Sequence, residues 1–160
     1  MSRVLTRRAA LATALAGALP FVAAPATAAG PARDPASHPA IAEAIAVARR
    51  TLPQFMERWD ANEPQDTGYA LKIAIGDQNG IEHLWISSLE RRNGRIYGRI
   101  DTRPLRVRSH AAGQRIEVRP DFIVDWMYFR RGRMVGNHTG RAMLPFMAPA
   151  EAEKLRLLFE

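Results

Sequence analysis

Two short apolar segments of this chain carry side chains that could do chemistry. The segment IEHLWIS contains Glu82, His83 and Trp85, and the segment IVDWMYF contains Asp125 and Trp126. Carboxylates and imidazoles transfer protons or bind metals, and an indole adds one hydrogen-bond donor to a large apolar ring. Because a carboxylate inside an apolar strand is costly unless it is hydrogen-bonded or paired, both acidic groups are expected to have partners.

A third stretch, GNHTGR, supplies further polar groups that could serve as those partners. Backbone amides and solvent are the other candidates. The candidate binding residues are Glu82, His83, Trp85, Asp125, Trp126, His138, Thr139 and Arg141.

Specific catalytic patterns are missing around these residues. Ser87 or Ser88 near His83, with Asp125, could form a nucleophilic triad, but the chain has no Gly-x-Ser-x-Gly elbow. A metal could draw on His83, His138, Asp125 and Glu82, yet no His-x-His or His-Glu-x-x-His pair fixes two ligands on one element. We therefore predict no catalytic residue, no metal and no cofactor.

A structural interpretation explains the same residues. Alternation places His83 and Trp85 on one face of a strand and Glu82 on the other, with apolar groups on both faces. We expect such a strand to be covered on both sides. A carboxylate or histidine on a neighbouring strand would then accept the indole hydrogen bonds, and the polar groups would join two strands. If this network opens to a groove, it would also recognise a ligand.

Two periodicities define the elements that position these residues. Apolar residues recur at helical spacing from Pro39 to Trp59, and Pro53 predicts a kink or a split in this helix. The pattern then alternates, which predicts short antiparallel strands joined by tight turns such as Asn93-Gly94. The expected strands cover residues 69–75, 81–87, 95–100, 115–118 and 123–129, with a short one near Met134 and a final helix over residues 150–159.

These elements predict an α+β domain with an N-terminal helix, five to six short antiparallel strands and a short C-terminal helix. Short strands joined by tight turns tend to curl, which protects their edges. We therefore expect a small SH3-like barrel with a helical extension. A helix laid across an open sheet, as in cystatins, is the alternative.

Residues 1–28 predict a signal peptide. Arg7 and Arg8 precede an uncharged run rich in alanine and leucine, and small residues follow at a signal-peptidase spacing. The paired arginines resemble a twin-arginine signal, with an ordinary secretory signal as the alternative. We predict cleavage after this segment, a flexible tether at 29–37 and a single domain at 38–160.

The charge and the residue composition of the chain are in line with an exported protein. The chain has 160 residues, a net charge of +7, 21 arginines, two lysines and no cysteine. The arginines are scattered rather than gathered on one face, so nucleic-acid binding is not expected. Without cysteine there is no disulfide, thiol nucleophile or lipid attachment site. A periplasmic or secreted protein without a transmembrane anchor after cleavage is predicted, and the oligomeric state stays open.

Five motifs, in order along the chain, resemble one bacterial family. They are EHLWI, GRIDTRP, GQRIEV, DWMY and GNHTGR. Together they are similar to the YegJ-like family, a domain of unknown function, over about residues 40–144. Thr102, Val124 and the pair Asn137-His138 depart from the family pattern. The resemblance implies a single YegJ-like domain, and it implies no reaction.

We therefore predict a small exported binding module that recognises a protein or a cell-envelope component. Contact would be made through the aromatic-rich sheet and the arginine-bearing loops. The alternative is a metal-dependent or hydrolytic enzyme centred on Glu82, His83 and Asp125.

Overall fold

The structure is a computed structural model that describes residues 38–160. The predicted signal peptide (1–28) and tether (29–37) lie outside the described residues. The elements in chain order are α1 (Pro39–Ala61), β1 (Asp66–Asp77), β2 (Gly80–Arg92), β3 (Arg95–Ile100), β4 (Arg115–Val118), the 3-10 turn η2 (Pro120–Phe122), β5 (Ile123–Arg130), β6 (Arg133–Gly136), α2 (His138–Met143), the 3-10 turn η3 (Leu144–Phe146) and α3 (Pro149–Leu158).

Helix α1 has clear start and stop signals. The imidazole Nδ1 of His38 accepts a hydrogen bond from the N–H of Ala40 at 3.3 Å, and Pro39 stands in the first turn, where its missing N–H is not needed. Asn62 ends the helix in the left-handed conformation, with φ 48°. The helix is not split at Pro53, because one continuous element runs through it. Its buried residues are Ile41, Ala44, Ile45, Ala48 and Phe55.

The six strands form one antiparallel sheet in the order β4-β3-β2-β1-β5-β6. Strand β1 is central and pairs with both β2 and β5. The β2–β3 turn uses Asn93 and Gly94 at φ 49° and 76°, as the tight-turn signal predicts. The sheet is open, with β4 and β6 at its edges. Of the two expected arrangements, the structure has the helix packed on an open sheet.

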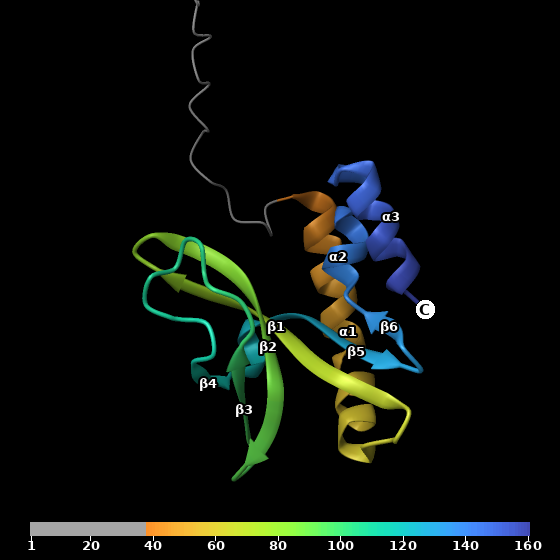
Figure 1. The fold of residues 1–160 in the computed structure, drawn as a ribbon. Helices are drawn as coiled ribbons and strands as arrows, with labels where there is room; N and C mark the ends of the chain where they lie inside the picture. The colour runs from red at the N-terminus through yellow and green to blue at the C-terminus, as the bar shows by residue number, and fades with distance from the viewer. Residues whose placement is uncertain (1–37) are drawn as a thin grey trace, which may run out of the picture. The chain divides into compact units, whose positions relative to one another are not determined.

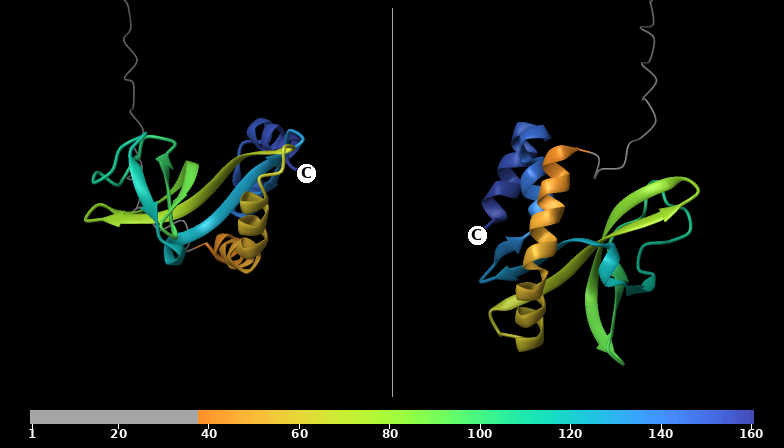
Figure 2. Two further views of the ribbon diagram at one scale, coloured as in Figure 1. Left: turned by 90° about the horizontal axis from the view of Figure 1, so that it is seen from below. Right: turned by 180° about the vertical axis from the view of Figure 1, so that it is seen from behind.

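The two ends of the sheet are covered differently. Figures 1 and 2 show the three helices gathered beside β5 and β6, with α1 crossing β5. The end of the sheet near β3 and β4 has no helix beside it. A long connection without regular structure, residues 101–114, lies there instead. One end is therefore packed by helices and the other by a loop.

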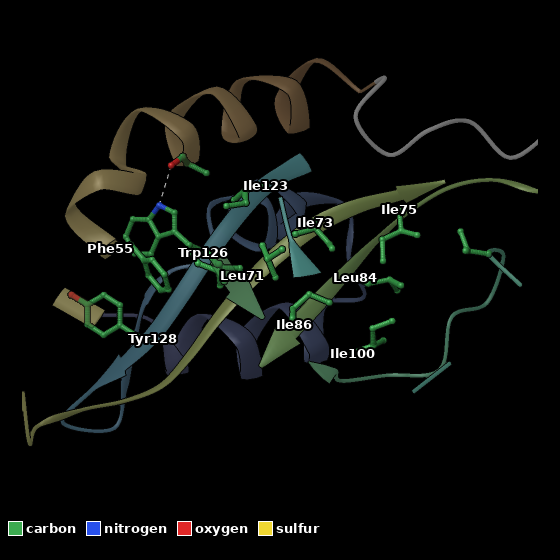
Figure 3. Packing of buried hydrophobic residues seen from close by; sticks show 14 residues of the cluster. Phe55, Leu71, Ile73, Ile75, Leu84, Ile86, Ile100, Ile123, Trp126 and Tyr128 are labelled. Carbon is green, nitrogen blue, oxygen red and sulfur yellow. Dashed lines mark hydrogen bonds between the residues drawn. The ribbon is translucent and has the colours of Figure 1, made fainter. Parts of the chain in front are cut away.

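The main core lies between α1 and one face of the sheet and continues toward β3 and β4 (Figure 3). Beneath α1 it is aromatic. Phe55 is 0% exposed and packs against Trp126 and Tyr69, with ring centroids 5.5 and 5.7 Å apart. Away from α1 it is aliphatic, with Ile86 and Ile100 both buried. One apolar core therefore joins the helix-covered and loop-covered ends.

The end of the chain returns to the sheet edge at β6. Phe159 forms a parallel bridge with Met134, and the N–H of Glu160 donates to the carbonyl of Met134 at 3.0 Å. The guanidinium of Arg141 lies over the Phe159 ring, 3.9 Å from its centroid. The outer side of β6 is therefore occupied at Met134. Within residues 38–160, β4 has a strand neighbour on one side only.

The α+β class, the N-terminal and C-terminal helices and the antiparallel strands are confirmed. The sequence did not lead us to expect α2, a helix of only six residues. Asn137 precedes it at φ 51°, and its side-chain oxygen accepts from the N–H of Gly140 at 3.1 Å. Asparagine at this position is a common N-cap, so a local signal for α2 was present.

Candidate functional site

The two carboxylates singled out by the sequence lie on opposite faces of the sheet. Glu82 is opposite Ile75 of β1. Lys72 of β1 is opposite Asp125 on one side and Trp85 on the other. Since side chains alternate along a strand, residues three apart point to opposite faces. The structure therefore does not bring Glu82 and Asp125 together, and the enzyme centred on both of them with His83 has no assembled centre.

Asp125 is a fully buried carboxylate with 0% of its surface exposed. It accepts four hydrogen bonds, from the N–H groups of Trp126 (2.9 Å), His138 (3.1 Å) and Thr139 (2.7 Å) and from the Thr139 hydroxyl (2.6 Å). Charge-assisted bonds of this kind are about twice as strong as neutral ones. Asp125 thus fixes the start of α2 against β5.

A lysine that the sequence analysis did not single out joins this group. The ammonium of Lys72 donates to the Thr139 hydroxyl at 2.8 Å and lies over the Trp85 ring, 4.6 Å from its centroid. Burial lowers the pKa of Lys72, although the charge of Asp125 raises it. We call Lys72, Trp85, Asp125 and Thr139 the lysine row, because three of them stand side by side on β2, β1 and β5.

Each histidine of the candidate set is next to one member of the lysine row: His83 is two residues from Trp85, and the N–H of His138 donates to Asp125. His83 is half-buried, on the same face as Trp85 and opposite Ala74. The ring of His138 packs edge-on against Trp126, with centroids 5.2 Å apart, and its Nε2 is buried without a hydrogen-bond partner. Burial lowers the pKa of His138, which favours the neutral imidazole.

Trp126 and Arg141 form hydrogen bonds between the sheet and the helices α1 and α2. The indole N–H of Trp126 donates to the carbonyl of Ala48 at 3.0 Å and to the hydroxyl of Thr51 at 3.2 Å, both on α1 (Figure 3 shows the bond to Ala48). The expected partner on a neighbouring strand is therefore wrong for this indole. Arg141 donates to the carbonyl of Gly136 at 3.0 Å, which ties α2 to β6.

Glu82 holds the long loop at the other end of the sheet. Its carboxylate accepts hydrogen bonds from the backbone N–H groups of Leu105, Arg106 and Val107 at 2.9–3.2 Å. Burial on its own would raise the pKa of Glu82, but these three donors keep it below its ordinary value. Its partner is therefore a loop backbone, not a side chain of the candidate set.

Asp77, at the end of β1, extends this anchor and was missed by the sequence analysis. It accepts from the N–H of Asn79 at 2.7 Å and from the N–H groups of Arg108 and Ser109 at 2.7 and 3.1 Å. These bonds lower the pKa of Asp77 to about 2. Together, Glu82 and Asp77 bind five consecutive backbone amides, and we call residues 101–114 the anchored loop. The only sequence signal was an acidic residue in a turn.

The anchored loop presents a leucine to solvent. Leu105 is 89% exposed, although Pro104 and Val107 beside it are buried. Arg103 and Arg108 are also exposed. An anchored backbone therefore holds one apolar and two cationic side chains outward.

A groove of about 530 Å³ adjoins this loop. Two large apolar groups at its rim, Ile81 and Phe122, are 41% and 43% exposed. His110 of the anchored loop also contributes to its wall. Its lining residues are Ile73, Ala74, Ile75, Gly76, Ile81, His110, Ile116, Glu117, Arg119 and Phe122.

No group of three or more histidine and acidic side chains in residues 38–160 is placed to hold a metal ion. In the same range, no helix is both long and apolar enough to cross a membrane.

Residues 38–156 match a family described as "Uncharacterized protein conserved in bacteria (DUF2314)". The chain belongs to this family, and the matched residues run from the start of α1 into α3. It is 32% identical over 109 residues to "Uncharacterized protein YegJ" of Escherichia coli (strain K12), covering 68% of this chain and 70% of the relative. The YegJ-like resemblance is thereby confirmed. No solved structure matches the chain.

Proposed function

We propose that this protein is an exported binding module that recognises a protein or cell-envelope component through the anchored loop. Export rests on the pattern of residues 1–28, and recognition rests on how the loop is built. The observation that supports it most is the set of five backbone amides held by Glu82 and Asp77 beneath an exposed Leu105. Ordered loops of this length without regular structure are usually functional.

The anchoring supports recognition because it restricts the loop before a partner arrives. A loop that becomes ordered on binding loses conformational entropy, which weakens the complex. Here the backbone from Leu105 to Ser109 is already bonded, and the buried side chains of Pro104 and Val107 fix its inner side. Binding would therefore order little more than the outward side chains.

The outward side chains indicate the chemistry of the partner. Burying one leucine side chain is favourable by about 1.5–3 kcal/mol. Arg103 and Arg108 would form charge-assisted bonds with carboxylates or phosphates around an apolar contact for Leu105. The groove rim at Ile81 and Phe122 extends the apolar part of the surface. We expect an acidic partner surface with a small apolar pocket.

A periplasmic capture experiment tests both parts. The full chain is expressed with its own N-terminus, recovered from the periplasmic fraction, and used to retain proteins from that extract. We expect a stoichiometric partner that is retained by the unchanged protein and about tenfold less by Leu105→Ser. Leu157→Ser is the matched control, since Leu157 is 63% exposed on α3.

Three outcomes would contradict the proposal. The protein could stay in the cytoplasm with residues 1–28 attached. The extract could yield no stoichiometric partner. The two leucine variants could also retain the partner equally well.

A further inference from the structure

Two unpaired strand edges border the groove of about 530 Å³. Strand β1 pairs with β5 only as far as Ile73, which is opposite Ile123, so residues 74–77 pair with β2 alone. Strand β4 pairs with β3 and, within residues 38–160, with no other strand. The turn η2 connects β4 to β5, and its Phe122 also lines the groove.

The lining shows that the groove follows these edges and does not lie over one face of the sheet. Consecutive residues of a strand point to opposite faces. The groove is nevertheless lined by consecutive residues of both strands, which are Ala74, Ile75 and Gly76 on β1 and Ile116 and Glu117 on β4. Both faces of a strand border a cavity only where the cavity runs along the edge of that strand. The groove therefore has the position of a further strand between β1 and β4.

The backbone of β4 presents hydrogen-bonding groups at this edge. The N–H of Ile100 donates to the carbonyl of Gln114 at 3.1 Å, so the backbone of Gln114 faces β3. In an antiparallel ladder, successive residues direct their backbone groups alternately to the two sides. The N–H and C=O of Glu117, three residues further, therefore point away from β3, where the described residues provide no strand. An edge of this kind can bind an extended peptide through main-chain hydrogen bonds.

The size of the groove suits a short extended segment. One strand residue occupies about 160 Å³, from a rise of about 3.3 Å, a strand spacing of about 4.8 Å and a depth of about 10 Å. The volume of about 530 Å³ thus accommodates about three residues, close to the four residues of β4. A helical segment would bond its own N–H and C=O groups and leave the edge of β4 unused.

The charge of the groove indicates the side chains that it would accept. The guanidinium of Arg119 lies over the Phe122 ring, 4.9 Å from its centroid, and within residues 38–160 it forms no ion pair. The one carboxylate of the lining, Glu117, is paired with Arg95 at 3.3 Å. The uncompensated charge is therefore positive, beside the exposed apolar groups of Ile81 and Phe122.

We propose that the groove binds an extended segment of a partner protein, with alternating acidic and apolar residues, which adds to β4 as a further strand. Main-chain hydrogen bonds form at Glu117, apolar side chains contact Ile81 and Phe122, and a carboxylate pairs with Arg119. The inference rests on the proposed function, because it assigns the groove to the same partner as the anchored loop, with which the groove shares His110.

A peptide of defined sequence tests the proposal. The probe is a capped hexapeptide of alternating isoleucine and glutamate, titrated into the isotopically labelled full chain and followed by the NMR signals of the backbone amides. We expect the shifted signals to gather at residues 74–77 and 115–119. Two control peptides carry lysine in place of glutamate, or N-methyl groups on the amides along one edge. Each control should bind at least about tenfold more weakly.

Two variants at one position separate the main chain from the side chain. Glu117→Pro removes the outward N–H, a change that edge strands tolerate, and should weaken binding of the acidic peptide by about tenfold. Glu117→Gln keeps this N–H and loses a negative charge, so it should bind the acidic peptide at least as tightly as the unchanged protein. Arg119→Gln should reduce the preference for the acidic peptide over the lysine peptide several-fold.

Several outcomes would overturn the proposal. The N-methylated peptide could bind as tightly as the probe, which decides the question even if Glu117→Pro does not fold. The two Glu117 variants could bind the probe alike. Two copies of the chain could also pair through β4 in place of binding the peptide.

Failure of the groove can be told apart from failure of the anchored loop. Capture of a partner that depends on Leu105, together with no binding of the peptide, would reject the groove and leave the loop in place. Binding of the peptide at β4, together with capture that Leu105→Ser does not weaken, would support the groove and reject the loop.

Discussion

Asp125 and the pair Asp77 and Glu82 use the same chemistry at opposite ends of the sheet. Each carboxylate accepts backbone N–H groups from a segment far along the chain. Asp125 is sealed under α2 with none of its surface exposed, whereas the anchored loop keeps Leu105 in solvent. The same bonds thus stabilise an enclosed helix start in one place and shape an exposed surface in the other.

The largest effect should come from the enclosed carboxylate. Replacing Asp125→Asn leaves an amide NH₂ facing three backbone donors and the Thr139 hydroxyl, so buried N–H groups lose their acceptor. We expect the free energy of unfolding to fall by about 3 kcal/mol, measured by chemical denaturation. Asp121→Asn, at an exposed position in η2, is the control. Equal stability of the two variants would contradict the enclosed role of Asp125.

A smaller effect should follow at the loop anchor. Glu82→Gln weakens three backbone bonds at a half-buried position, and we expect a loss of about 1–2 kcal/mol in unfolding free energy. Trypsin should also cut faster after Arg106, because the loop opens locally. Glu117→Gln removes an exposed ion pair with Arg95 and should cost at most about 0.5 kcal/mol. If trypsin cuts both variants alike, Glu82 does not anchor the loop.

The most localised effect should be the opening of the anchored loop when Asp77 is protonated at low pH. The pKa of this carboxyl is lowered to about 2 in the folded protein, from an unfolded value of about 3.9. A lowered pKa contributes stability that is fully present above the unfolded value and is lost as pH falls through the folded value. The protection of the Arg108 and Ser109 amides, which is their slowing of hydrogen exchange relative to an unstructured chain at the same pH, should therefore fall between about pH 4 and about pH 2.

In Asp77→Asn this acid step should be absent, because the side chain no longer titrates. Exchange at Thr139, which depends on Asp125, serves as the reference amide in the same sample. Loss of protection at Thr139 and Ser109 at the same pH would mean that the two ends of the sheet open together. That result would remove the distinction between them.

Local patterns were sufficient to predict the strands and the first and last helices, because each has its own signal, whereas α2 was not predicted. Alternation from Tyr69 onward and the Asn93-Gly94 turn predicted the strands, and proline at position 39 predicted the helix start. The opposite faces of Glu82 and Asp125 depend on how β1 pairs with both neighbours. That register is a tertiary property, and the two segments alone do not contain it.

The sequence indicated the partners of only some polar groups. Thr139, in the GNHTGR stretch, does bond to Asp125. The indole of Trp126 was expected to bond to a side chain on a neighbouring strand, but it bonds to α1. Backbone amides were among the candidate partners of Glu82, but nothing indicated that they would belong to a loop 23 residues away. Every residue except proline has a backbone N–H group, so the residue types in the sequence do not show which N–H will be the partner. Lys72 alternates with the apolar residues Leu71 and Ile73, and this periodicity does not reveal what covers the face that carries the lysine.

The chain end at β6 also affects how copies of this protein could meet. Within residues 38–160, Phe159 and Glu160 cover the edge of β6 at Met134, whereas the four-residue β4 at the opposite edge has no strand on its outer side. A molecule with two unpaired edge strands can extend one continuous sheet through many copies. A molecule with one unpaired edge strand can pair in this way with a single other copy. We therefore expect edge-to-edge pairing of two copies through the described domain to use β4.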